Sequence, residues 1–71
     1  MAPNVGDRFI SLDGERDDDD GVERLTPPGS IGTVMNVYEE FGGADLLFDN
    51  GAWVVPFFHE LSNTTQYRKV D

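Results

Sequence analysis

The densest group of residues with chemical potential is an acidic run, Asp13–Glu23, in which most side chains are charged. Carboxylate oxygens suit Ca²⁺, and an EF-hand loop needs acids at its first, third and fifth positions, glycine at the sixth and glutamate at the twelfth. Counted from Asp13, the sixth residue is Asp18 and the twelfth is Arg24, and the frame beginning at Glu15 fails in the same way. We therefore expect no dedicated metal site, only nonspecific screening by cations.

Groups suited to catalysis are few. The chain has one histidine, no cysteine and no glycine-rich phosphate loop, which leaves few routes to a nucleophile or a general base. His59 precedes Glu60 but has no evident serine partner, and a lone histidine usually satisfies a local hydrogen bond. We expect no catalytic residues, no cofactor and no enzymatic activity.

Aromatic side chains are numerous for a chain of 71 residues. Burial dominates the energetics of large aromatic groups, so Trp53 and Phe57 are predicted to fill the core. Tyr38, Phe41 and Phe58 lie at expected strand ends or turns, where a core role and a binding role fit the sequence equally well.

Net charge is the strongest feature of the composition. Fourteen acids against five bases give a formal charge of −9. Such a field repels nucleic-acid phosphates and anionic membranes and favours encounter with basic partners, although it can also serve solubility alone.

The composition also bears on location. The absence of cysteine suits a reducing compartment, and no apolar run approaches the roughly 20 residues that cross a bilayer. The first residues lack the basic and apolar regions of a signal peptide. We predict a cytoplasmic protein with no membrane contact.

Short apolar runs separated by Gly, Pro, Asn and Asp predict an all-β domain. The expected strands cover 5–12, 31–38, 44–48, 52–58 and 66–70, with one helical turn near 58–61. Asn50-Gly51 predicts a hairpin turn because both residues tolerate left-handed φ values. Pro56 cannot donate to a ladder, so its strand should end there or lie at an edge. The acidic residues 13–26 are expected to form a long solvated loop.

Curling five such strands into a small barrel buries their apolar face and reduces exposed edges. The side chains expected to meet in its interior are Phe9, Val34, Leu46, Phe48 and Val55.

Four segments together resemble the SH3-like barrel, particularly the bacterial and KOW-type small barrels: Val5–Phe9, Pro28–Val34, Leu46–Gly51 and Val55–Leu61. The resemblance implies one domain over residues 1–71, a five-stranded antiparallel barrel. It places the acidic loop between the first two strands and the last strand or tail at 63–71.

The same resemblance bears on partners. KOW-type modules carry basic loops for RNA, whereas the corresponding loop here holds Asp17, Asp18, Asp19 and Asp20, so direct nucleic-acid binding is not expected. Related tudor domains use aromatic residues at one rim as a cage for methylated lysine or arginine, through cation–π attraction.

We therefore predict a non-catalytic protein-interaction module whose acidic face binds a basic partner surface. The candidate binding residues are Asp17, Asp18, Asp19, Asp20, Tyr38, Phe41 and Phe58. One alternative is a phage-type inhibitor that imitates nucleic-acid charge. Another is an accessory domain of a larger enzyme or complex, which would expose an apolar patch at Phe57-Phe58.

Overall fold

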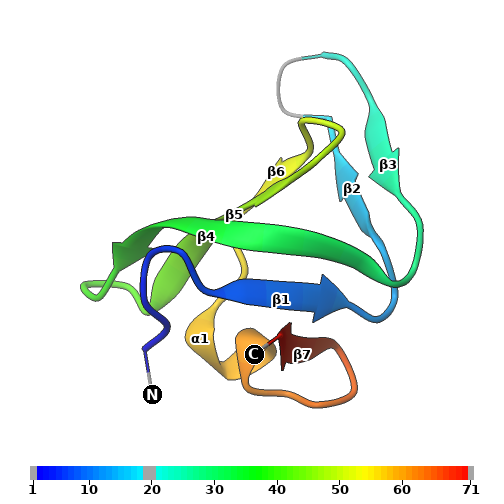
Figure 1. Cartoon of the computed structure of the whole chain (residues 1–71). Helices are drawn as coiled ribbons and strands as arrows, with labels where there is room; N and C mark the ends of the chain where they lie inside the picture. The colour runs from blue at the N-terminus through cyan, green and yellow to red at the C-terminus, as the bar shows by residue number, and fades with distance from the viewer. Residues whose placement is uncertain (1, 19–20, 71) are drawn as a thin grey trace.

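A computed structural model describes residues 2–18 and 21–70, which form an all-β domain with one short helix (Figure 1). The strands are β1 (Arg8–Ser11), β2 (Glu15–Asp17), β3 (Arg24–Thr26), β4 (Ser30–Tyr38), β5 (Gly43–Phe48), β6 (Trp53–Val54) and β7 (Tyr67–Val70). The helix α1 (Phe58–Leu61) lies between β6 and β7. The predicted all-β class is confirmed.

Two sheets make up the domain. Five strands form an antiparallel sheet in the order β6-β5-β4-β1-β7, and β2 pairs with β3 in a separate two-stranded sheet. The β2–β3 hairpin follows β1 and stands beside β6 (Figure 1). The predicted closure into a barrel is not found among the described residues, because β6 and β7 end the sheet as unpaired edges.

The core lies on one face of the five-stranded sheet. Its buried apolar residues are Phe9, Val34, Ala44, Leu46, Phe48, Ala52, Leu61 and Tyr67, which confirms four of the five predicted interior positions. Gly32 belongs to this face because a Cβ there would lie 2.7 Å from Cγ of Leu46 and 2.9 Å from Cζ of Phe48. Glycine thus lets two large side chains pack against the β4 backbone.

The prediction that Val55 is buried is wrong, as is the prediction that Trp53 and Phe57 fill the core. Pairing of β5 with β6 sets Leu46 opposite Val54, and directly paired residues share a face of the sheet. Val54 therefore points inward, and its alternating neighbours point outward, with 47% of Val55 exposed. The predicted alternation of 52–58 between two faces is confirmed, but the pairing register with β5 determines which of the two sets of residues is buried.

The segment 13–26 is not a simple solvated loop. Glu15 pairs with Thr26, Arg16 with Leu25 and Asp17 with Arg24, which makes it a hairpin. Asp17 and Thr26 are buried, so the inward face of this hairpin is formed by polar side chains and not by apolar ones. Asp19 and Asp20, predicted as binding residues, lie outside the described residues.

The turn between β5 and β6 differs from the predicted one. Only Gly51 takes a positive φ, of 88°, while Asn50 does not. The N–H of Gly51 donates to the carbonyl of Phe48 (2.9 Å), and that of Phe48 donates to Ala52 (2.9 Å). This is a three-residue loop with glycine at its left-handed position. The Asn50 side chain supports it by accepting from the Ala52 N–H and donating to the Leu25 carbonyl, both at 3.0 Å.

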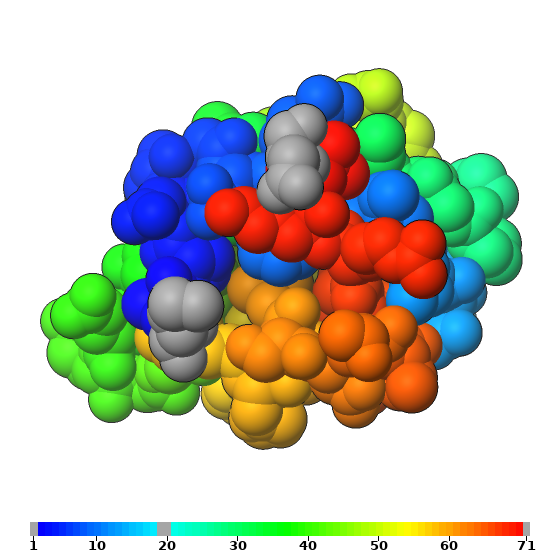
Figure 2. Space-filling model, turned by 60° about the horizontal axis from the view of Figure 1, so that its bottom comes forward, coloured from blue at the N-terminus to red at the C-terminus, as the bar shows by residue number. Residues whose placement is uncertain are grey.

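The helix α1 lies at the end of the molecule opposite the β2–β3 hairpin (Figure 1). Figure 2 shows the N-terminal segment, β7 and the chain leading into β7 together on this side. Leu61 of α1 is buried in the core cluster. Within the described residues no helix combines the length and apolar character that a bilayer crossing requires.

Candidate interaction surface

The outer face of the sheet exposes an unusual concentration of large apolar side chains. We call Tyr38, Phe41, Trp53, Val55 and Phe57 the aromatic surface. The rings of Tyr38 and Phe41 stack at 5.3 Å with an interplanar angle of 18°, and Phe41 meets Phe57 edge-on at 6.4 Å and 87°. Phe57 in turn stacks on His59 at 5.6 Å. Segments from β4, the following turn and the chain after β6 thus contribute one continuous row of rings.

Local irregularities place these rings. The β4–β5 register shifts between Val34 and Asn36, which brings Asn36 opposite Asp45 and Tyr38 opposite Gly43. A bulge of this kind redirects side chains relative to a regular ladder. A Cβ at residue 43 would overlap the ring of Phe41 and force it to move, so Gly43 allows the ring to take this position. The aromatic ring therefore lies directly over backbone.

Asp45 lies buried beneath the aromatic surface. Its Oδ2 accepts hydrogen bonds from Tyr38 Oη (2.6 Å) and Asn36 Nδ2 (2.9 Å). Burial opposes ionisation of Asp45, but these two donors, with a smaller contribution from the Trp53 side chain, outweigh it and lower the pKa of Asp45. Asp45 is therefore a fixed negative charge at neutral pH.

Tyr38 is the donor that connects this charge to the ring row. Its hydrogen bond to Asp45, with smaller contributions from burial and from the charge of Asp45, raises the pKa of the phenol. Tyr38 consequently remains a protonated donor at neutral pH, and its ring is held in place for the stack with Phe41.

A shallow groove of about 630 Å³ adjoins the row of rings. Its lining residues are Phe41, Gly42, Phe57, Phe58, His59 and Ser62. Phe58 is half-buried and packs against the core, so it links the groove to the interior. The backbone is held by Glu60, whose Oε1 accepts the N–H of Phe57 at 2.8 Å.

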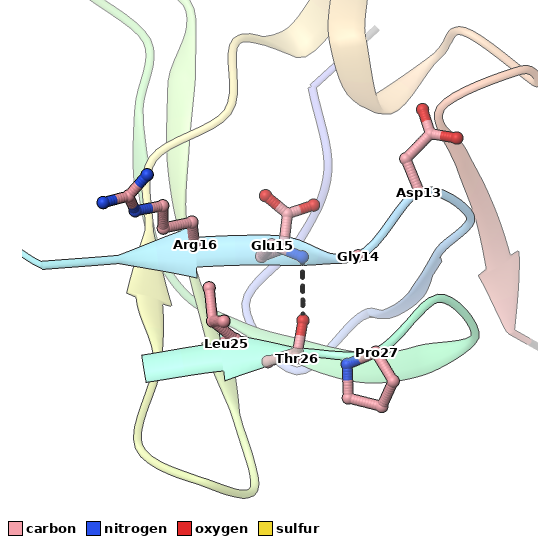
Figure 3. Close-up of a pocket in the computed structure, with 7 residues that line it drawn as sticks. All are labelled: Asp13, Gly14, Glu15, Arg16, Leu25, Thr26 and Pro27. Atoms are coloured by element: carbon pink, nitrogen blue, oxygen red, sulfur yellow. Dashed lines mark hydrogen bonds between the residues drawn. The ribbon is translucent and has the colours of Figure 1, made fainter. Parts of the chain in front are cut away.

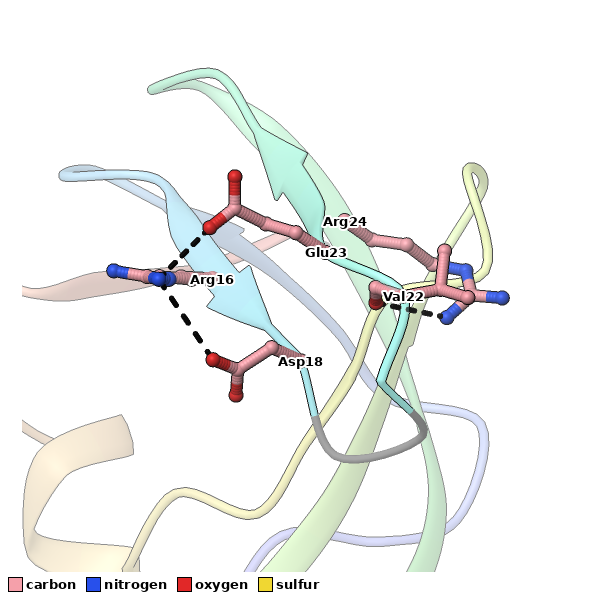
Figure 4. A network of polar contacts seen from close by, with 5 residues as sticks. All are labelled: Arg16, Asp18, Val22, Glu23 and Arg24. Carbon is pink, nitrogen blue, oxygen red and sulfur yellow. Dashed lines mark hydrogen bonds and ion pairs between the residues drawn. The ribbon is translucent and has the colours of Figure 1, made fainter.

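The acidic hairpin contrasts with this surface, because its charges contact one another. Arg16 reaches Glu23 at 2.8 Å and Asp18 at 3.7 Å, and Arg24 donates to the Val22 carbonyl at 3.5 Å (Figure 4). These contacts are exposed, so each adds little stability. They nevertheless partly neutralise the acidic run.

Asp17 is the exception in the hairpin, because it is buried and points toward the sheet. Its Oδ2 accepts the backbone N–H of Trp53 at 2.7 Å, across 36 residues of sequence. This bond attaches the hairpin to β6. Asp17 is therefore a residue that positions Trp53, not part of an exposed acidic face.

A second hollow, also of about 630 Å³, lies on the hairpin (Figure 3). It is lined by Asp13, Gly14, Glu15, Arg16, Leu25, Thr26 and Pro27. Glu15 donates its backbone N–H to Thr26 Oγ1 at 2.9 Å, and its carboxylate accepts from Ser11 Oγ (2.5 Å) and Tyr67 Oη (2.7 Å). The carboxylate of Glu15, which lines this hollow, therefore links β2 to β1 and β7.

The structure brings together some of the predicted site residues and separates others. Tyr38 and Phe41 stack, and Phe58 lines the adjoining groove, whereas Asp17 and Asp18 lie on the hairpin. Sequence reasoning missed the outward-facing residues of 53–57 and the role of Asp45. The signal for Asp45 was present, since it is the one charged residue in the otherwise apolar run 43–48.

No metal centre is formed by the residues described: within 2–18 and 21–70, no three His, Asp or Glu side chains lie close enough to hold an ion. Comparison of the chain with protein-family models, with curated proteins and with solved structures found no match in any of the three.

Proposed function

We propose that this chain is a non-catalytic protein-interaction domain that binds a basic partner through its aromatic surface. The observation that carries the proposal is exposure: 53% of Phe41, 46% of Phe57 and 38% of Trp53 are open to solvent on one face. Contiguous exposed apolar side chains mark interaction sites, and aromatic residues are enriched at the energetic centres of interfaces. In so small a domain, leaving these side chains exposed reduces the apolar area buried in the core, and the stability of the fold depends on that area.

The proposal includes an SH3-like fold. Support comes from the strand order β6-β5-β4-β1-β7, the long hairpin inserted between β1 and β4, and the helical turn before β7. These features match the order of segments in the resemblance drawn from the sequence. Folds of this kind serve many functions, so the interaction role is argued from the aromatic surface alone.

Charge and composition support the choice of partner. A net charge of −9 favours association with a basic surface and speeds its encounter. The lack of cysteine suits the reducing cytoplasm, where we place the complex.

The test compares two double variants in capture from host lysate. Phe41→Ser with Phe57→Ser removes the centre of the aromatic surface. Val22→Ser with Leu25→Ser removes the exposed apolar side chains of the hairpin and serves as the matched control. Because each of the four side chains is about half exposed, we expect each double variant to remain folded, with a loss of stability of about 1–3 kcal/mol.

The wild type and the control should recover the same partner, and the aromatic variant should lose it. Circular dichroism establishes that each variant is folded. Recovery of that partner in equal amount by the folded aromatic variant would refute the proposal.

The exposure of Phe57 also favours the second candidate, an accessory domain of a larger complex. The dependence of binding on salt concentration distinguishes the two candidate functions. A complex steered by charge weakens as ionic strength rises, whereas one held by apolar burial persists. A stoichiometric complex that survives high salt would favour the accessory role.

A further inference from the structure

We infer, building on the proposed function, that the aromatic surface binds an arginine side chain of the partner. The guanidinium would stack on the exposed ring of Phe41, beside Phe57 and the shallow groove. Three features of the molecule lead to this ligand: the stretch of chain that supplies the rings contains no lysine or arginine, acidic residues adjoin the rings, and Phe41 and Phe57 stand at a steep angle to each other beside a groove.

The first feature is the distribution of basic residues. Every ring of the surface comes from the stretch between Leu25 and Tyr67, which contains no lysine or arginine. The same stretch contains five acids: Glu39, Glu40, Asp45, Asp49 and Glu60. Two of the five bases, Arg68 and Lys69, lie on β7, at the opposite edge of the sheet from β6. Electron-rich ring faces attract cations, and the one basic side chain of this stretch is that of His59, which stacks on Phe57.

The second feature is negative charge close to the rings. The exposed residues Glu39 and Glu40 directly precede Phe41 in the turn, and Asp45, which is ionised, lies at the hydroxyl of Tyr38. The Tyr38 hydroxyl donates to the Asp45 carboxylate at 2.6 Å, which increases the electron density of the Tyr38 ring. A cation held on these rings gains both the ring attraction and the Coulomb attraction.

The third feature is shape. Tyr38 and Phe41 lie nearly parallel, whereas Phe57 stands at 87° to Phe41 beside the shallow groove. A planar guanidinium can stack on a ring and direct its N–H groups sideways to carboxylates, which a tetrahedral ammonium cannot do. Arginine is therefore preferred over lysine.

Charge also excludes the competing occupants. A second copy of the chain carries the same charge of −9 and is repelled, and so is a nucleic-acid backbone. A basic segment of another protein is the occupant that the surface favours.

The experiment is an NMR titration of the full chain with three capped peptides: acetyl-Leu-Arg-Leu-amide and its analogues with lysine and with citrulline. Citrulline keeps the size and planarity of arginine without its charge. The arginine peptide should shift the resonances of Tyr38, Phe41 and Phe57 saturably. The citrulline peptide should bind roughly 5- to 30-fold more weakly, the range that a cation–π contact supports.

Two variants locate the effect. Phe41→Leu keeps an apolar side chain but removes its ring, and it should reduce the preference for arginine over citrulline. Leu25→Ser, on the hairpin, should leave that preference unchanged. Equal binding of the arginine and citrulline peptides, or no saturable shift on the aromatic surface up to roughly 10 mM, would overturn the inference. Equal binding of the lysine peptide would overturn the choice of arginine.

The outcome is separable from that of the proposed function. If the peptides fail while the folded Phe41→Ser, Phe57→Ser variant still loses its partner, the surface binds a different chemistry. If that variant retains its partner, the interaction role itself fails.

Discussion

The β2–β3 hairpin carries dense charge, whereas the aromatic surface over β5 carries large apolar side chains in solvent. In the hairpin, Arg16 pairs with Asp18 and Glu23, and Asp17 caps a backbone amide of β6. In the aromatic surface the polar group, Asp45, is buried and satisfied, while the rings are left without a cover. Exposed apolar area, more than charge density, therefore indicates where the binding of a partner can release free energy.

The two regions meet at Trp53. Its backbone N–H donates to Asp17 of the hairpin, and its side chain helps to lower the pKa of Asp45 in β5. The hairpin is therefore a support for one edge of the aromatic surface. Changes to single carboxylates test this division of roles.

Asp17→Ala should have the largest effect. It leaves the Trp53 N–H without this acceptor and releases the hairpin from β6, so we expect a loss of about 2 kcal/mol in the free energy of unfolding. Asp18→Ala, the adjacent control, removes only an exposed ion pair and should change stability by less than about 0.5 kcal/mol. Urea denaturation measures both. Equal effects would contradict the assignment of Asp17 as a buried anchor.

Asp45→Asn should cost slightly less, about 1.5 kcal/mol at neutral pH, because an amide accepts fewer of the surrounding donors. The pKa of Asp45 is lowered from its ordinary value of 3.8, so its contribution is present above that pH and is lost as pH falls through the folded-state value. The stability difference between wild type and variant should therefore shrink in acid. A difference that stays constant from neutral pH to well below 3.8 would contradict this.

Tyr67→Phe should have the smallest effect at neutral pH, about 1 kcal/mol, because Glu15 keeps its bond from Ser11. Burial, followed by the bond to Glu15 and nearby acids, raises the pKa of Tyr67 above its ordinary 10.0. Its contribution is complete below pH 10.0 and is lost at higher pH, since the unfolded chain ionises first. Above that pH, wild type should lose roughly 1.4 kcal/mol per pH unit more than the variant. Parallel stability curves would contradict the role of Tyr67.

Much of the fold was predictable because it depends on local signals. The strand at 31–38, the turn at 39–43 and the presence of a hairpin at Asn50-Gly51 follow from residue types alone, whereas the three-residue form of that hairpin loop does not. Which side chains of 52–58 are buried was not predictable, since Ala52, Val54 and Pro56 are as apolar as the residues between them. The candidate site was accordingly found in part: Tyr38 and Phe41 were named, whereas Trp53 and Phe57 were assigned to the core.

The acidic run shows the same limit in polar residues. Asp17 and Asp18 are chemically identical neighbours, yet Asp17, the last residue of β2, bonds to β6, whereas Asp18, just after the strand, is exposed. No local property of the sequence distinguishes them, because the acceptor role of Asp17 depends on an amide 36 residues away.

The all-β class, the positions of most strands and turns, and the charge that favours a basic partner are all predictable from the sequence. These depend on interactions between near neighbours and on composition. The outward orientation of Trp53, Val55 and Phe57 and the acceptor roles of Asp17 and Asp45 arise only in the folded chain. Cross-strand register and long-range hydrogen bonds set those outcomes, and both arise only when distant segments pair.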